Sequence, residues 1–283
     1  NTFTGVGTHG SIIQGISDSK TSNINWEKVA PQFGDPISSV VFANGQFLAA
    51  SETYSNFMSH YGEDWYRVDS PSLSFISHGE SGFVGSFMNI DSLHIYRLPS
   101  YNGTWSLSTS IDGNFDITQF KFDGHQFVFM GRRCEIPCSF DDDDDESNDS
   151  AEPVLYTSVY GAEWDDTNLN IPSSYFNDFA WSYIDQIYMA VSNDGSIYTS
   201  ENLSTWTLHH SIEDGICLSI AVNQQSGIAI AVCQDSNGYA TVLRSINRGS
   251  TWDEVNPSCE LESFQKTETV TYNYEYNMFY LGG

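Results

Sequence analysis

Tryptophan recurs along this chain of 283 residues at nearly regular intervals. Six of the seven tryptophans are separated by 39, 40, 59, 42 and 46 residues. They are Trp26, Trp65, Trp105, Trp164, Trp206 and Trp252. Each follows short runs in which Phe, Ile, Val and Tyr alternate with polar residues, the pattern of β-strands. A repeat of about 40 residues holding four short strands is typical of a β-propeller, so we predict an all-β fold.

The repeat is most complete between residues 215 and 254. Four apolar-rich runs follow one another there and read as the four strands of one blade: Ile216–Val222, Gly227–Gln234, Thr241–Ser245 and Thr251–Val255. Elsewhere the dipeptides Asn44-Gly45 and Asp123-Gly124 separate paired runs, as in a tight β-hairpin. These signals predict antiparallel four-stranded blades.

The turn that closes the best repeat reads Ser245-Ile-Asn-Arg-Gly-Ser-Thr-Trp252. It resembles the Asp-box, Ser-x-Asp-x-Gly-x-Thr-Trp, of sialidase-like (BNR) β-propellers, with Asn247 in place of the Asp. Shorter copies run from Ser59 to Trp65 and from Ser158 to Trp164. A short polar side chain that bonds its own backbone, a permissive Gly and a Trp against the blade make this a folding device.

We predict a single six-bladed propeller over residues 1–283, with four-stranded blades. Five blades span about 37–68, 73–108, 117–166, 177–210 and 216–255, and the sixth combines 268–283 with 1–29. In that sixth blade Thr269–Tyr272 and Met278–Leu281 supply the inner strands. Ser11–Ile16 and Asn25–Val29 supply the outer ones. Pairing the two ends of the chain in one sheet leaves no open edge.

Charge excludes some partners. Asp and Glu number 37 against 10 Lys and Arg, which gives a net charge of −27. Such a chain repels nucleic acid and an anionic membrane surface. The chain contains no run of 18 apolar residues, so the sequence predicts no membrane-spanning helix. The acidic surface keeps the chain soluble.

Several features favour an extracellular, glycosylated protein. The chain begins at Asn1, as expected of a processed form. Glycosylation sequons begin at Asn102, Asn148 and Asn202, and the first and last of these fall in turns just before a repeat tryptophan. A glycan at such a turn faces water.

The five cysteines favour an oxidising compartment. If Val222 lies opposite Ile228, Cys217 lies opposite Cys233, so we predict a disulfide there. The same register separates large apolar side chains on one face from Cys, Ser and Ala on the other. Cys134 and Cys138 close a small loop as a second predicted disulfide, and Cys259 is left over. Five thiols in a cytosolic protein are the alternative.

Residues 132–153 form an acidic insertion. Carboxylates at Asp141, Asp143, Asp145, Asp149 and Glu152 match the ligand spacing of an EF-hand-like calcium loop. Glu146 stands where that loop has its Gly, and flanking helices are absent. The insertion is a calcium-site prediction, with a solvated acidic loop as the alternative.

The resemblance to sialidases implies three arginines around a carboxylate, a Tyr nucleophile paired with Glu, and an acid/base Asp. The candidate arginines are Arg67, Arg97, Arg132, Arg133, Arg244 and Arg248. Two of them are expected to be structural: Arg67 follows a repeat tryptophan, and Arg248 lies inside a closing turn. The seven His show no metal spacing, and neighbouring His209 and His210 point to opposite faces of a strand. Trp181, off the repeat, is a core residue or a stacking surface for a sugar.

Three functions remain open. The first is a secreted, non-catalytic propeller that binds carbohydrate or an extracellular protein. The second is a structural subunit that self-assembles into an extracellular filament or coat, and the third is a sialidase-like glycoside hydrolase. Calcium is the one cofactor predicted.

Overall fold

The computed structural model describes residues 2–7, 11–17, 24–28, 36–51, 53, 56–100, 103–134, 151–169, 171, 175–255, 267–274 and 277–282. The described residues form β-strands, turns and loops, without a helix among them. The strands pair with their sequence neighbours in seven antiparallel sheets. Two of these sheets are incomplete in the described part of the chain: β1–β3 and β24–β25.

Five sheets contain four strands each. The first two are β4 Ile37–Ala43, β5 Gln46–Ser51, β6 Asn56–Ser59, β7 Tyr66–Val68, and β8 Phe75–Gly79, β9 Gly82–Met88, β10 Ser92–Leu98, β11 Ser106–Asp112. The next two are β12 Asn114–Phe122, β13 Phe127–Cys134, β14 Glu152–Ser158, β15 Asp165–Asp166, and β16 Phe176–Ser182, β17 Ile187–Ser192, β18 Ser196–Ser200, β19 Thr207–Ser211. The fifth is β20 Ile216–Val222, β21 Ala229–Gln234, β22 Ala240–Ser245, β23 Asp253–Glu254.

The ends of the chain form the two smaller sheets. One has three strands, β1 Thr2–Gly7, β2 Ser11–Ser17 and β3 Ile24–Lys28, and the other is the hairpin of β24 Thr269–Asn273 and β25 Met278–Gly282. Strand β1 was not predicted from the sequence. The two sheets are separate, so the six-blade count and the closing blade shared by both ends stay predictions.

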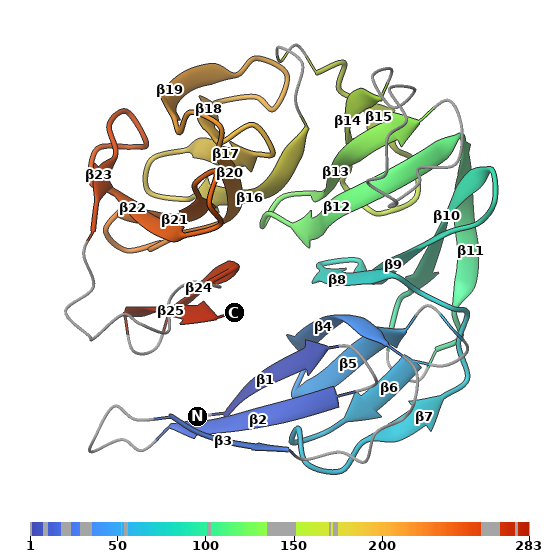
Figure 1. Cartoon of the computed structure of the whole chain (residues 1–283). Helices are drawn as coiled ribbons and strands as arrows, with labels where there is room; N and C mark the ends of the chain where they lie inside the picture. The colour runs from blue at the N-terminus through green and yellow to red at the C-terminus, as the bar shows by residue number, and fades with distance from the viewer. Residues whose placement is uncertain are drawn as a thin grey trace.

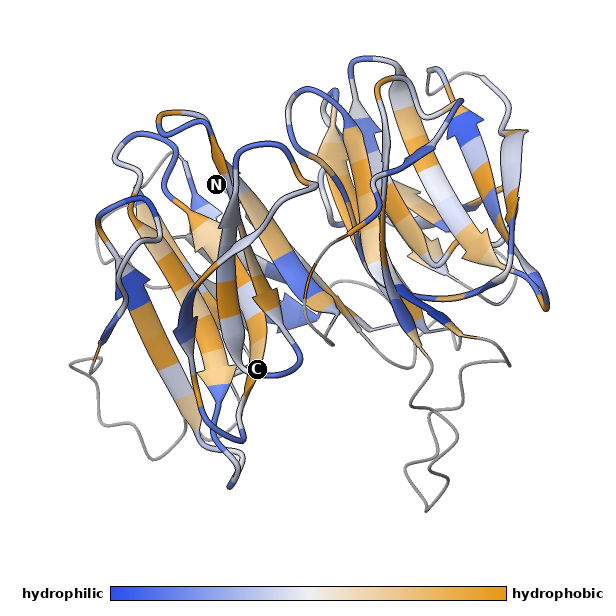
Figure 2. Cartoon of the chain, turned by 90° about the horizontal axis from the view of Figure 1, so that it is seen from above, coloured by the Kyte–Doolittle hydropathy of each residue, from blue (hydrophilic) through white to orange (hydrophobic). Residues whose placement is uncertain are grey.

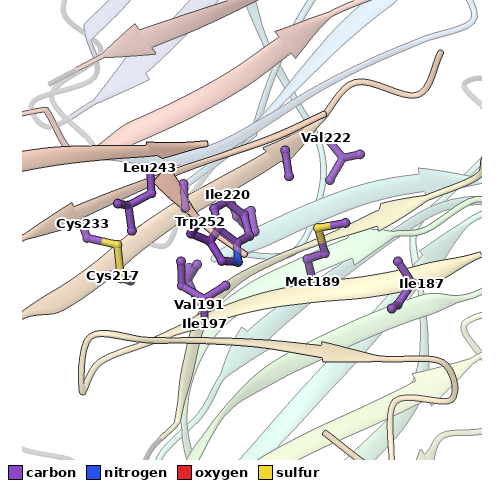
Figure 3. Packing of buried hydrophobic residues seen from close by; sticks show 12 residues of the cluster. Ile187, Met189, Val191, Ile197, Cys217, Ile220, Val222, Cys233, Leu243 and Trp252 are labelled. Atoms are coloured by element: carbon purple, nitrogen blue, oxygen red, sulfur yellow. A yellow bond between two sulfur atoms is a disulfide. The ribbon is translucent and has the colours of Figure 1, made fainter. Parts of the chain in front are cut away.

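The sheets follow one another around a ring in chain order, and the first strand of each full sheet faces the centre (Figure 1). Six clusters of buried side chains join neighbouring sheets, from the β1–β3 sheet round to β24–β25. Orange apolar segments lie along the strands in Figure 2, and many of the turns are blue and polar. The cluster between the β16–β19 and β20–β23 sheets contains Met189, Ile220 and Trp252 (Figure 3). The core is therefore a series of inter-blade layers.

Four of the first strands carry a β-bulge near the same place. The pairing register shifts around Ser38 in β4, Thr118 in β12, Asn177 in β16 and Leu218 in β20. A bulge inserts one residue and turns the following side chains to the other face. Three of these bulges, at Ser38, Thr118 and Asn177, place a polar side chain that donates to the next sheet. Thr118 Oγ1 donates to the Phe176 carbonyl at 2.5 Å, and Asn177 Nδ2 donates to the Cys217 carbonyl at 2.9 Å.

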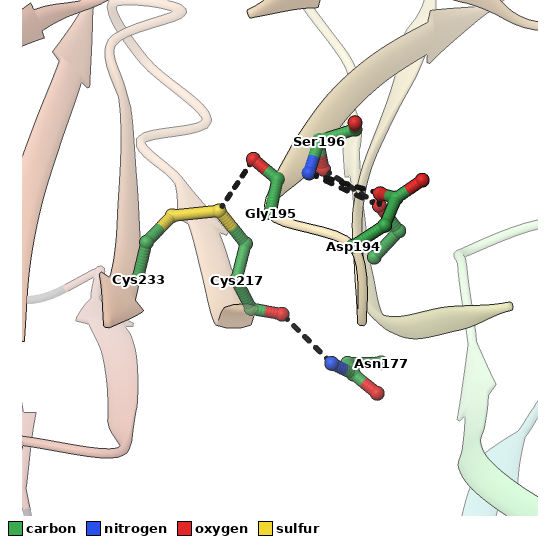
Figure 4. Close-up of a disulfide and its surroundings, with 7 residues drawn as sticks. Asn177, Asp194, Gly195, Ser196, Cys217 and Cys233 are labelled. Carbon is green, nitrogen blue, oxygen red and sulfur yellow. Dashed lines mark hydrogen bonds between the residues drawn. A yellow bond between two sulfur atoms is a disulfide. The ribbon is translucent and has the colours of Figure 1, made fainter. Parts of the chain in front are cut away.

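The bulge at Leu218 corrects one sequence prediction. Cys217 does lie opposite Cys233, and the two are joined by a disulfide, as predicted (Figure 4). Beyond the bulge, however, Val222 pairs with Ala229 instead of Ile228. Ile220 therefore shares a face with the cysteines, and the predicted separation of large from small side chains is wrong.

Candidate functional site

Three of the turns that close the blades, after β6, β18 and β22, share one hydrogen-bond pattern. In the turn after β6, Ser59 Oγ accepts from the Gly62 amide at 2.8 Å, and Trp65 Nε1 donates to the Gly62 carbonyl at 2.7 Å. The middle residue has positive φ, 85° at Gly62. Because Gly adopts that conformation without strain, the sequence Ser-x-x-Gly-x-x-Trp suits this turn.

Two further turns repeat the pattern with different residues. After β22 the Gly249 amide donates to Ser245 Oγ at 3.0 Å, and Trp252 Nε1 donates to the Gly249 carbonyl at 2.9 Å. After β18, Leu203 takes the place of Gly, with a φ of 65°, and accepts from Trp206 Nε1 at 2.7 Å. The recurring Ser and Trp are thus explained by folding.

These turns lie on one side of the ring, which we call the hairpin face. In an antiparallel meander, the turns between first and second strands and those between third and fourth strands fall on the same side. The hairpin face exposes apolar side chains at these turns: Phe42, Tyr61, Val159, Tyr160, Tyr183, Ile184, Ile246 and Tyr274. The turns of the opposite side expose three among the described residues, Ile90, Ile216 and Tyr239. The apolar surface is therefore gathered on the hairpin face.

An aromatic cluster lies where the β12–β13 and β16–β17 turns meet. The ring of His125 lies 6.0 Å from that of Trp181 and 5.9 Å from that of Tyr183, centre to centre. A Cβ added at Gly124 would lie 1.3 Å from Tyr183 Oη, so the Tyr183 hydroxyl rests against that turn. Trp181 Nε1 is buried without a hydrogen-bond partner among the described residues. A buried indole N–H of this kind is costly.

Asp123 and Tyr188 form the floor of this cluster. Asp123 Oδ1 accepts from the amides of His125 and Gln126, at 2.7 and 2.8 Å. Tyr188 Oη donates to Asp123 Oδ2 at 2.6 Å, and the Tyr188 ring lies 4.3 Å from that of Trp181. Burial, followed by the hydrogen bond to Asp123, raises the pKa of Tyr188. Burial and the charge of Asp123 likewise raise the pKa of Tyr183, so both phenols are neutral donors at neutral pH.

A charged network connects the central strands. Lys121 Nζ forms an ion pair with Asp178, whose side chain is 4% exposed. Asp178 Oδ2 also accepts from Ser219 Oγ at 2.9 Å and from the Ile220 amide at 3.1 Å. The Val270 amide donates to Ser219 Oγ at 3.2 Å. These contacts link four neighbouring central strands, β12, β16, β20 and β24. The role of Asp178 is therefore structural.

The candidate arginines of a sialidase-like site lie on four different sheets. Arg132 Nε donates to Asp116 at 3.0 Å, and its guanidinium lies 5.0 Å from the centre of the Tyr175 ring. Arg133 donates to Tyr156 and lies over Phe115. Burial, followed by the charge of Asp166, raises the pKa of Tyr156 to about 12. The remaining arginines, with their elements, are Arg67 on β7, Arg97 on β10, Arg244 on β22 and Arg248 in the turn after it.

Among the predicted sites on described residues, Asn202 and Cys134 are the clearest. Asn202 is exposed, and its Oδ1 accepts from the amides of Ser204 and Thr205 at 3.1 and 2.9 Å. The same turn geometry leaves the Asn202 side chain at the surface, where a glycan has room. Cys134 is disulfide-bonded, and its predicted partner Cys138 lies outside the described residues.

The other predicted sites fall largely outside the described residues. These are Asn102, Asn148, Cys259 and the calcium candidates Asp141, Asp143, Asp145 and Asp149. Glu152 begins β14, exposed and opposite Arg133. Within the described ranges no group of three or more His, Cys, Asp or Glu is placed to hold a metal ion. No described helix is long and apolar enough to cross a membrane.

Comparison with known proteins supports the fold alone. No protein-family model matches the chain, and no curated protein matches its sequence. Among solved structures, the WD40 β-propeller domain of Doa1 has a TM-score of 0.63 at 11% identity, with 100% of this chain and 86% of that one covered. YCF48 bound to D1 peptide has a TM-score of 0.62 at 17% identity, covering 90% and 78%.

A third similar structure is the GH74 enzyme of Niastella koreensis, with a TM-score of 0.60 at 13% identity. It covers 95% of this chain, but the chain spans only 39% of that enzyme. All three likenesses agree with the four-stranded antiparallel sheets described above. The chain has a β-propeller fold.

Proposed function

We propose that this chain is a secreted, non-catalytic β-propeller whose hairpin face binds a partner protein. The gathering of exposed apolar side chains on that face carries the proposal. Exposed apolar side chains gathered on one face favour an interaction surface there, and aromatic residues are enriched at the centres of interfaces. The aromatic cluster of His125, Trp181 and Tyr183 is the expected centre of the contact.

Two observations support the remaining parts of the proposal. The disulfide between Cys217 and Cys233 suits an oxidising compartment. The arginines that a sialidase-like centre needs are spread over several sheets. Three of them contact Asp116, Tyr156 or an aromatic ring: Arg132, Arg133 and Arg67. A carbohydrate partner is the second candidate, because the exposed faces of the aromatic cluster suit stacking on a sugar ring.

The test compares two matched pairs of substitutions. The variant Tyr183→Ala/Ile184→Ala alters the hairpin face. Ile90→Ala/Tyr239→Ala removes the same two residue types from the opposite side, where they are more exposed. Partners captured from extracellular fluid by cross-linking are quantified against wild type, beside a glycan array and hydrolysis of generic glycosides. We expect the first pair to lose the captured partner and the second to keep it. Equal loss in both pairs, or turnover of a glycoside, contradicts the proposal.

A further inference from the structure

A small cavity lies on the hairpin face at the turn from β6 to β7, on a different blade from the aromatic cluster. Its volume is about 220 Å³, and it is lined by Ser59, His60, Tyr61, Glu63, Asp64 and Tyr66. Three rings and two carboxylates therefore surround one space. The rings of His60 and Tyr66 are nearly parallel, with centres 6.5 Å apart and planes at 26°.

Folding of the turn does not explain these rings. The turn from β14 to β15 has the same length and makes the same bond from the Gly161 amide to Ser158 Oγ, at 2.8 Å. At the positions of His60 and Tyr66 it carries Val159 and Asp165. The backbone therefore forms without either aromatic side chain.

The rings are held in place but are not buried. Tyr66 is 45% exposed, and its hydroxyl donates to Met58 Sδ at 3.2 Å. Tyr61 is 80% exposed, and its ring centre is 6.4 Å from that of His60. Because these rings line the cavity at this exposure, they are available to contact a ligand instead of filling the core.

The charge around the cavity selects the ligand. Glu63 and Asp64 are both exposed at its rim, and no Lys or Arg lines it. Aromatic faces attract a cation within about 6 Å of a ring centre, and carboxylates add to that attraction. The net charge of −27 raises the local concentration of cations. We propose that this cavity binds an alkylammonium group, the lysine side chain of a basic partner protein.

The chain offers its own control at the turn from β18 to β19. The equivalent cavity, of about 340 Å³, is lined by Ile187, Thr199, Ser200, Glu201, Asn202, Thr205 and Thr207. Thr207 stands where the first cavity has Tyr66, and Glu201 stands where it has His60. It has one carboxylate and no aromatic ring, so it lacks the π-faces that the proposal requires.

The experiment follows the ring protons of Tyr61 and Tyr66 by NMR in the whole chain. The probes are Nα-acetyl-lysine amide and its uncharged counterpart Nα-acetyl-norleucine amide. We expect the lysine probe to shift these signals and the norleucine probe to leave them unchanged. His60→Val and Tyr66→Thr, which copy residues found at the equivalent turns, each weaken binding about two- to fivefold. Glu63→Gln/Asp64→Asn weakens it as well, and Thr207→Ala does not.

Three results would overturn the inference. They are equal binding of the norleucine probe, unchanged binding in both His60→Val and Tyr66→Thr, and a loss caused by Thr207→Ala. Tighter binding of tetramethylammonium than of the lysine probe would overturn the assignment to lysine. The proposed role of the Trp181 cluster is tested by Tyr183→Ala/Ile184→Ala, which leaves this cavity intact, so either proposal can fail without the other.

Discussion

One serine and one tryptophan fix the shape of the closing turns after β6, β18 and β22. The serine hydroxyl accepts a hydrogen bond from the amide of the residue with positive φ. The indole N–H donates a hydrogen bond to the carbonyl of that same residue. One turn departs from this pattern: Trp164 Nε1 is buried without a hydrogen-bond partner among the described residues. The two kinds of tryptophan therefore differ in what their N–H contributes.

This difference predicts unequal costs for the same substitution. Trp206→Phe leaves the carbonyl of the buried Leu203 without its donor, which costs about 1–3 kcal/mol beyond the lost packing. Trp164→Phe removes an indole N–H that has no partner, so its free energy of unfolding falls less. Urea denaturation of both variants measures the difference. An equal loss in both contradicts the assigned hydrogen bond.

His78 predicts a pH dependence at the residue scale. Burial lowers its pKa below the ordinary value of 6.5, and its ring contacts Phe83 with centres 4.6 Å apart. The folded state thus favours the neutral form of His78. The stability that this preference contributes is fully present above pH 6.5, and it is lost as pH falls through the pKa of His78 in the folded state. We expect His78→Gln to show a smaller fall in Tm between pH 7 and pH 5 than wild type. An identical fall would show that His78 does not titrate in this window.

At the scale of the strand, alternation predicted much of what is observed. The predicted run Ile216–Val222 is a strand with those bounds, and Thr241–Ser245 differs from β22 by one residue. A bulge leaves no such signal in the sequence. The inserted residue is stabilised by a neighbouring sheet, and the run itself does not show that contact. Leu218 looks like any apolar residue of the run, so the faces beyond it were assigned wrongly.

The inter-blade network gives a prediction for Asp178. Removing this buried carboxylate takes one acceptor from the Ile220 amide and one from the Ser219 hydroxyl, and it removes the ion pair of Lys121. We expect Asp178→Ala to cost about 3 kcal/mol. Asp116→Ala, which removes a carboxylate that is 20% exposed against 4% for Asp178, is the control and should cost about 1 kcal/mol or less. Chemical denaturation measures both, and equal costs would rule out the structural role of Asp178.

The disulfide gives a second prediction for the same pair of strands. Cys217 and Cys233 are 16 residues apart, so the bridge restricts a short loop in the unfolded chain. In the chain-entropy model a loop of this size contributes about 3 kcal/mol. Cys217→Ala/Cys233→Ala should lose about that much in denaturation without reductant. If wild type with and without reductant unfolds at the same denaturant concentration, the bridge is absent in solution.

For the whole molecule, the sequence predicted architecture better than sites. The tryptophan period predicted the β-propeller, because a similar tryptophan turn recurs in several blades. The closing blade predicted from the two ends of the chain stays a prediction, because β1–β3 and β24–β25 are separate sheets among the described strands and local patterns do not show how distant strands pair. The aromatic cluster was missed for a similar reason. His125 and Tyr183 sit at the tips of separate hairpins, and only the packed ring brings them beside Trp181.

The acidic charge and the predicted calcium loop are tested together at this scale. With a net charge of −27, the folded chain repels itself, so NaCl should raise Tm by screening. Calcium held by Asp141, Asp143, Asp145, Asp149 and Glu152 would add to that effect. We expect millimolar CaCl2 to raise Tm above NaCl of matched ionic strength and to slow protease cleavage between residues 140 and 153, with an affinity of about 10⁻⁴–10⁻³ M. The variant Asp149→Asn/Glu152→Gln is the control and should lose the calcium increment while keeping the response to NaCl. Equal Tm values in CaCl2 and in NaCl of matched ionic strength would mean that the insertion is a solvated acidic loop.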